Sequence, residues 1–142
     1  MAAKTRLEEL FEASSPLARR LAEEEPFDSD AELIERARQL LPTLPEADRI
    51  ATLNAHPRIG EHAAAMSARS QREQGAELLP ELDALNDDYE RKFGFRFVVF
   101  VNRRPKAEIV EVLRSRLLNS REEELATGLQ AILDIAADRA HS

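Results

Sequence analysis

The stretch SREEELATGLQAILDIA, residues 120–136, carries the clearest structural signal in this chain of 142 residues. Ser120 and Glu123 form the Ser-x-x-Glu pattern of a capping box, in which each side chain bonds the other residue's backbone at the start of a helix. Apolar residues then recur at helical spacing: Leu125, Leu129, Ile132, Leu133 and Ala136. The pattern predicts an amphipathic helix whose apolar face is buried.

The same periodicity extends over most of the chain and predicts an all-α fold. Two more capping boxes, Ser29 with Glu32 and Thr43 with Glu46, precede further periodic apolar segments. Helices are expected over residues 31–41, from Thr43 onward, over 79–92 and from Pro105 to Leu117, with two short ones in the first forty residues. Because no repeat or long linker interrupts the chain, we expect one compact domain, residues 1–142, built as a bundle of about eight or nine helices.

One stretch departs from the helical pattern. The segment FRFVVFV, residues 95–101, is rich in β-branched and aromatic residues and follows Gly94, which by propensity indicates a strand. A strand needs a partner, and no second segment of comparable strength is present. We therefore expect a buried extended connector, or a short helix, that crosses the middle of the domain.

The charge balance excludes several classes of partner. The chain has 20 Lys and Arg against 27 Asp and Glu, a formal net charge of −7, which argues against nucleic acid or an anionic membrane. It has no cysteine, so disulfides, thiol nucleophiles and thiolate metal sites are excluded. No apolar run approaches the ~18–20 residues of a transmembrane helix, and the first residues lack the apolar core of a signal peptide. We therefore expect a soluble, cytoplasmic protein.

Of the three histidines, His56 is the strongest candidate for chemistry. His141 lies in a polar tail, and His62 follows His56 by six positions, about 240° away around a helix. No H-E-x-x-H pattern is present, so no metal site is expected. His56 immediately precedes Pro57, which disfavours helix at His56 and predicts a junction between two helices. A histidine at a junction can project into an interior cleft, although a purely structural role is the commoner explanation.

Other candidate residues also have ordinary structural explanations. Ser70 and Glu73 place a hydroxyl and a carboxylate on one helical face, but the same spacing is that of a capping box. Arg139, near the end of the last helix, would ordinarily offset the negative end of the helix dipole. No phosphate-binding glycine loop, G-x-S-x-G motif or paired-carboxylate motif occurs. Taken singly, these residues define no activity.

Taken together, four segments resemble one family in their order and spacing. They are HPRIG (56–60), S-x-x-E-Q (70–74), N-x-x-Y-x-x-KFGF-x-FV (86–98) and the segment from Arg116 to Arg139. They resemble the OHCU decarboxylases, the 2-oxo-4-hydroxy-4-carboxy-5-ureidoimidazoline decarboxylases of uric acid breakdown, and the likeness extends over almost the whole chain. It implies a compact all-α fold and a cofactor-free decarboxylation that yields (S)-allantoin and carbon dioxide.

The resemblance also implies roles for individual residues. His56 would be the catalytic acid or base, and Glu73 would hold the ureido group or handle a second proton. The other substrate-binding residues would be Pro57, Ser70, Val99 through its backbone, and Arg139 toward an anionic or carbonyl oxygen. One departure concerns Asn102-Arg103-Arg104-Pro105, which stands where the family often has a glycine-containing loop.

The expected chemistry suits a chain without a cofactor motif. Decarboxylation leaves an electron pair on carbon, and here the substrate offers its own sink, a carbon–nitrogen double bond beside the carboxylated carbon. A histidine, with an ordinary pKa of about 6.5, suits proton transfer near neutral pH, so we expect His56 to take the proton of the substrate hydroxyl. Because a protein of charge −7 repels a carboxylate on balance, its capture needs a local cation, and Arg139 is the candidate.

The sequence leaves two other functions open. One is a paralogue of the same fold that acts on another ureide. The other is a non-catalytic helical module that binds a partner protein through an apolar face, which predicts that the polar candidates share no pocket. The resemblance is also compatible with a homodimer, although the periodicity identifies no interface.

Overall fold

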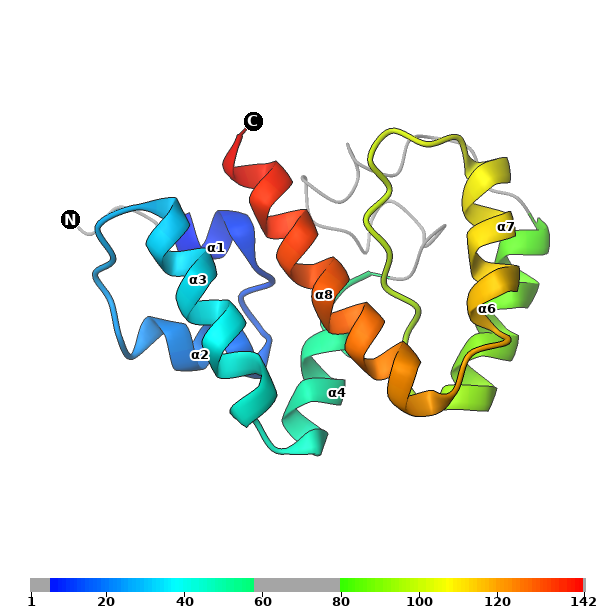
Figure 1. The fold of residues 1–142 in the computed structure, drawn as a ribbon, viewed down its shortest axis with the longest axis horizontal. Helices are drawn as coiled ribbons and strands as arrows, with labels where there is room; N and C mark the ends of the chain where they lie inside the picture. Colours follow the sequence, from blue (N-terminus) through cyan, green and yellow to red (C-terminus); the bar gives the residue numbers. More distant parts are fainter. Residues whose placement is uncertain (1–5, 58–79, 142) are drawn as a thin grey trace.

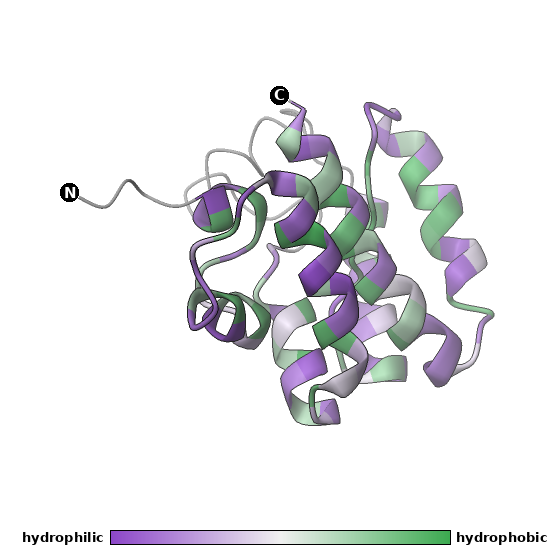
Figure 2. Cartoon of the chain, turned by 60° about the vertical axis from the view of Figure 1, so that its left-hand side comes forward, coloured by the Kyte–Doolittle hydropathy of each residue, from purple (hydrophilic) through white to green (hydrophobic). Residues whose placement is uncertain are grey.

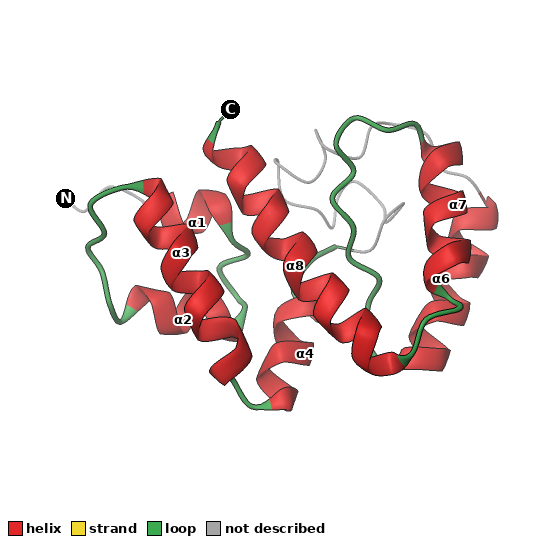
Figure 3. Cartoon of the chain, in the orientation of Figure 1, coloured by secondary structure: helices red, strands yellow, loops and turns green. Residues whose placement is uncertain are grey.

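The computed structural model describes residues 6–57 and 80–141. Its elements in chain order are α1 (Arg6–Leu10), α2 (Pro16–Ala22), α3 (Asp30–Leu40), the 3₁₀ turn η1 (Leu41–Thr43), α4 (Glu46–Asn54), α6 (Pro80–Phe93), α7 (Lys106–Arg116) and α8 (Arg121–Ala140). The described residues form helices and loops without a strand (Figure 3), which confirms the all-α class. The seven α-helices in these two ranges are slightly fewer than the expected number. None of the described helices is long and apolar enough to cross a membrane.

The long helix α8 is the element around which the others are arranged (Figure 1). Helices α1, α3 and α4 pack against it, while α6 and α7 form a pair on the other side of α8 from α1–α3. The capping box is present in full, because the Glu123 N–H donates to Ser120 Oγ at 3.1 Å and the Ser120 N–H donates to Glu123 Oε1 at 2.8 Å. All five predicted apolar positions of this helix are buried.

The described helices are amphipathic, as their periodicity predicts. Figure 2 shows hydrophilic and hydrophobic residues alternating around the helices. At one point α8 approaches α4 closely, because a Cβ added to Gly128 would lie 2.9 Å from Cδ2 of Leu53. This approach fixes the last turn of α4, from which the chain leads directly to His56.

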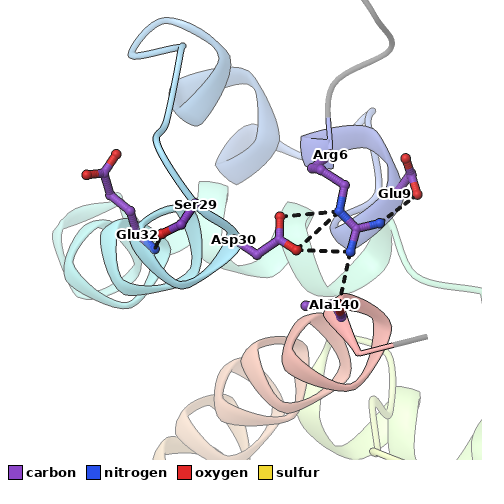
Figure 4. Close-up of polar contacts among 6 residues, drawn as sticks. All are labelled: Arg6, Glu9, Ser29, Asp30, Glu32 and Ala140. Carbon is purple, nitrogen blue, oxygen red and sulfur yellow. Dashed lines mark hydrogen bonds and ion pairs between the residues drawn. The ribbon is translucent and has the colours of Figure 1, made fainter.

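The start of α3 agrees with the sequence prediction in part. Ser29 Oγ accepts the Glu32 N–H at 3.0 Å (Figure 4). The Glu32 carboxylate, however, accepts the N–H of Asp28 at 2.9 Å. Ser29 is therefore the N-cap of α3, and the reciprocal bond of the box is shifted by one residue.

The third predicted capping box, Thr43 with Glu46, does not form, so this prediction is wrong. Helix α4 begins at Glu46 with Pro45 as its N-cap, and no side chain caps it. The Thr43 hydroxyl instead donates to the Leu40 carbonyl at 2.7 Å, within the η1 turn. The reason is that Pro45, with its fixed φ, starts the helix two residues later than the Ser/Thr-x-x-Glu spacing suggests.

The C-terminal end of α8 is held by Arg6 of α1. Arg6 Nη2 donates to Asp30 Oδ2 at 3.0 Å and to the carbonyl of Ala140 at 3.2 Å (Figure 4). The last carbonyls of a helix lack partners within the helix, so this arginine supplies one and joins α1, α3 and α8. Arg139, the residue before Ala140, therefore lies on a fixed helical turn.

The segment of residues 95–101, called the connector below, is an extended chain without a strand partner in the described residues. Gly94, with φ of +82°, ends α6 and redirects the chain, a backbone conformation that other residues rarely adopt. Phe95, Phe97, Val98 and Val99 are then buried in the core. The expectation of a buried extended connector is confirmed, and the strand propensity reflects burial of apolar side chains.

The connector ends in a turn that uses no glycine. Asn102 and Arg103 both have positive φ, +49° and +62°, in the left-handed region that asparagine tolerates better than most residues. Arg104 stabilises the turn by donating to the carbonyls of Phe100 and Val101, at 2.6 and 3.1 Å. The chain thus forms this turn without the glycine that the family often has there.

Candidate active site

His56 lies just beyond the last turn of α4. Its N–H donates to the carbonyl of Leu53 at 3.1 Å, Pro57 follows, and the His56 residue is only 6% exposed. The predicted end of a helix before His56 is therefore confirmed. The helix expected to begin at Pro57 falls on residues 58–79, outside the described residues.

The buried His56 imidazole is neutral at physiological pH. Burial, and secondly the positive charge of Arg139, lower the pKa of His56 to about 3. The ordinary histidine pKa of about 6.5 therefore does not apply to the buried His56. A neutral imidazole has a free lone pair, so His56 is able to accept a proton but not to donate one as an imidazolium.

This burial predicts that acid weakens the fold. The unfolded chain, where the histidine pKa is about 6.5, binds more protons than the folded chain between that pH and about 3. The His56 contribution to stability is thus fully present above about pH 6.5 and is lost as the pH falls toward 3. Between pH 7 and pH 5 we expect the free energy of unfolding of the wild type to fall by about 2 kcal/mol more than that of His56→Asn, measured by urea denaturation. Equal losses in the two proteins would contradict a buried neutral His56.

Arg139 points into the protein from the last turn of α8. It is 2% exposed, and its Nη1 donates to the Leu10 carbonyl at 3.3 Å and to Glu12 Oε2 at 3.1 Å. Arg139 is therefore a buried, paired cation and not a solvent-exposed one at the helix end, which is what its position alone suggested. The effect of Arg139 on the pKa of His56 shows that the two residues are electrostatically coupled.

Glu12 pairs with Arg139, and sequence reasoning did not predict this contact. It lies in the loop between α1 and α2, and its side chain is 14% exposed where it pairs with Arg139. The two residues are 127 positions apart, so no local spacing links them. None of the motifs that carry the resemblance contains Glu12, so the sequence offered no signal for this pairing.

The connector is attached directly to the His56 turn. Arg96 Nη1 donates to the carbonyls of His56 and Asn54, at 2.8 and 3.1 Å. Val99 itself is buried and lines a surface cleft of about 510 Å³ between the connector, α7 and α8. The lining of that cleft includes neither His56 nor Arg139, so any contribution of Val99 to their site is left to its backbone.

The structure places only some of the expected site residues. His56, Pro57 and Arg139 lie in described parts of the chain, whereas Ser70 and Glu73 lie outside the described residues. Within residues 6–57 and 80–141, no group of three or more histidine, aspartate or glutamate side chains is arranged to hold a metal ion.

The arrangement can be compared with known proteins. The family model described as OHCU decarboxylase matches residues 1–141. The 2-oxo-4-hydroxy-4-carboxy-5-ureidoimidazoline decarboxylase of Halalkalicoccus jeotgali is 32% identical over 139 residues, which covers 92% of this chain and 78% of that protein. The protein of the same name from Xenopus laevis is 32% identical over 123 residues, covering 79% of this chain and 70% of its own length. A uric acid degradation bifunctional protein of a Bacillus species is 30% identical over 138 residues, which make up 27% of that longer protein.

Solved structures show the same fold. A crystal structure of OHCU decarboxylase in the presence of (S)-allantoin superposes with a TM-score of 0.72 at 24% identity, covering 90% of this chain and 89% of that one. A crystal structure of (S)-allantoin synthase gives a TM-score of 0.68 at 20% identity, covering 96% of this chain and 47% of that one. With a family match over residues 1–141 and relatives above 30% identity, the chain belongs to the OHCU decarboxylase family.

Proposed function

We propose that this chain, as a single domain over residues 1–142, decarboxylates 2-oxo-4-hydroxy-4-carboxy-5-ureidoimidazoline to (S)-allantoin and carbon dioxide in uric acid degradation. Membership of the family supports the reaction class. The observation in the structure that carries the proposal is the buried, neutral His56 coupled to the buried Arg139. Together they supply a proton acceptor and a cation, the two groups that this substrate requires.

The reaction balances without an external electron sink. His56 takes the proton of the substrate hydroxyl, and the carbon–carbon bond to the carboxylate breaks to release carbon dioxide. The bonding pair forms a double bond to the carbon that bears the ureido group and displaces the π pair of the carbon–nitrogen double bond onto the ring nitrogen, which takes a proton. The carbon that bears the ureido group then gains a second proton while the former hydroxyl carbon becomes a carbonyl. One of these two protons is the one that His56 took from the hydroxyl, and the other comes from outside the substrate. Glu73 and Ser70 hold the ureido and ring groups, Pro57 lines the site, and Glu73 is the candidate for the second proton.

Substrate binding itself makes His56 a stronger base. The pKa of His56 is low because burial and the charge of Arg139 both disfavour the imidazolium. The substrate brings a carboxylate, and a negative charge close to a buried imidazole raises its pKa. The bound carboxylate also faces Arg139, which reduces the effect of that arginine on His56. Proton transfer is therefore favoured only when the substrate is in place.

Arg139 binds the substrate carboxylate or carbonyl oxygen, and Arg139→Lys tests this role. Lysine keeps the charge but loses the planar fork that matches a carboxylate. We expect KM to rise about tenfold, the size of one lost charge-assisted hydrogen bond, with a smaller change in kcat. Steady-state kinetics measures both, and circular dichroism checks that the variant is folded. An unchanged KM would remove Arg139 from the site.

The function is tested by a coupled assay in which urate oxidase and hydroxyisourate hydrolase generate the unstable substrate in situ. Circular dichroism then follows the optically active allantoin, with EDTA present. Rapid formation of (S)-allantoin supports the proposal. A rate equal to spontaneous decay contradicts it and favours a paralogue that acts on another ureide or a protein-binding module. The cytoplasmic location and the homodimer stay predictions, and sedimentation of the purified protein tests the second.

A further inference from the structure

His56 occupies a position that the helix alone does not fix. It lies two residues after the last helical residue, Asn54, where the carbonyls at a helix end have no partners within the helix. A catalytic side chain has to be held close to its productive geometry, and displacement by about 1 Å can cost a hundredfold in rate. Something outside α4 has to hold this turn.

Arg96 makes that connection from the connector. Its Nη1 donates to the carbonyl of His56 at 2.8 Å and to the carbonyl of Asn54 at 3.1 Å. Its backbone N–H also donates to Asn54 Oδ1 at 2.9 Å. Three hydrogen bonds therefore join one residue of the connector to the turn that carries His56, 40 positions earlier in the chain.

The backbone at Arg96 is held in place by its packed neighbours. Its hydrogen bonds can therefore hold the turn at His56 in position. Side chains alternate along an extended chain, and the neighbours Phe95 and Phe97 are both buried in the core. Further along, Arg116 Nη1 donates to the carbonyl of Val98 at 2.8 Å. The half-buried Arg96 thus extends toward α4 from a segment that is packed on both sides of it.

We propose that Arg96 is a positioning residue for His56, and this inference rests on the proposed role of His56 in decarboxylation. The guanidinium holds the backbone of residues 54–56 and thereby the orientation of the imidazole. It bonds carbonyls and not the ring, and the low pKa of His56 is accounted for by burial and Arg139. Loss of Arg96 should therefore lower kcat without moving the pH profile.

Arg96→Met tests the inference against a matched control, Arg49→Met. Arg49 is also half-buried and also donates to a backbone carbonyl, that of Leu44 at 3.1 Å, but at the opposite end of α4. We expect kcat to fall about tenfold to a hundredfold in Arg96→Met, with KM within about twofold and the pH profile unchanged. Arg96→Lys, which can still donate to one carbonyl, is expected to recover part of the rate, and Arg49→Met to retain the wild-type kcat.

A second measurement does not depend on activity. The chain has three histidines, so ¹³C–¹H spectra of the imidazole Cε1–H groups give three signals, and the His56→Asn spectrum identifies that of His56. We expect the His56 signal to broaden or split in Arg96→Met and to stay sharp in Arg49→Met. An unaltered signal, or an altered signal with unchanged kcat, overturns the inference. If the wild type itself forms no allantoin, the proposed function fails, whereas the spectra still test whether Arg96 orders His56.

Discussion

His56→Asn is expected to lower kcat/KM for (S)-allantoin formation by about a thousandfold in a protein that still folds. Removing a general base typically costs between about a hundredfold and ten-thousandfold. Asparagine is polar, neutral and of similar shape, but it is no base. Because the wild-type imidazole is itself neutral, the substitution leaves the local charge unchanged, so the loss should appear in kcat while KM changes little. The coupled circular dichroism assay measures both constants.

Two comparisons make this result specific to His56. His56→Ala should lose at least as much activity, since it also empties part of the site. His141→Asn provides a matched control, because His141 is exposed at the C-terminal end of α8 and should keep the wild-type rate. If His56→Asn and His56→Ala both retained the wild-type kcat/KM, proton transfer by His56 would be refuted.

The elements that could be predicted are those fixed by local sequence. The predictions of the capping box at Ser120 and of the buried apolar face of α8 were both correct. The residues that form each of these features lie within a few positions of one another. The prediction failed where a neighbour changed the outcome, as Pro45 did for the Thr43–Glu46 box. Strand propensity alone would have predicted that the connector pairs in a sheet. Only the lack of a partner segment indicated that it is extended and unpaired.

The candidate site was predictable only in part, for the same reason. The junction at His56 followed from Pro57, whereas the proposed role of Arg139 came from the resemblance and from the need for a local cation. The contacts of Glu12 with Arg139 and of Arg96 with His56 span 127 and 40 positions, and no periodicity connects residues so far apart. The low pKa of His56 likewise depends on burial and on a charge from another helix.

Buried contacts around Glu124 form an ionic network next to the connector. Glu124 is 0% exposed, and its Oε1 accepts from Tyr89 Oη at 2.6 Å and from Arg116 Nε at 2.7 Å. Its Oε2 accepts from Asn119 Nδ2 at 2.7 Å. Arg116 also lies over the Phe97 ring, with its Cζ 4.6 Å from the ring centroid. The carboxylate thus joins α6, α7 and α8 at one buried point.

Glu124→Gln is expected to lower the free energy of unfolding by about 3–5 kcal/mol. The amide keeps the shape of the side chain but leaves the buried Arg116 guanidinium without a counter-charge. It also replaces one of the two acceptor oxygens by a donor, either where Oε1 accepted from Tyr89 and Arg116 or where Oε2 accepted from Asn119. Urea denaturation at pH 7 measures the change. The matched control is Glu122→Gln in the same first turn, whose side chain is exposed and whose loss should cost about 0.3–1 kcal/mol through the helix dipole.

The double variant Glu124→Leu with Arg116→Met separates the ion pair from the packing. If most of the cost of each single change comes from leaving one buried charge unpaired, removing both charges should cost clearly less than the sum of the two single changes. Additive losses in the free energy of unfolding would contradict that account.

Because Arg116 also donates to the Val98 carbonyl, the double variant frees the middle of the connector from which Arg96 reaches His56. A double variant that stays folded should therefore resemble Arg96→Met in kinetics, with kcat lowered and KM nearly unchanged.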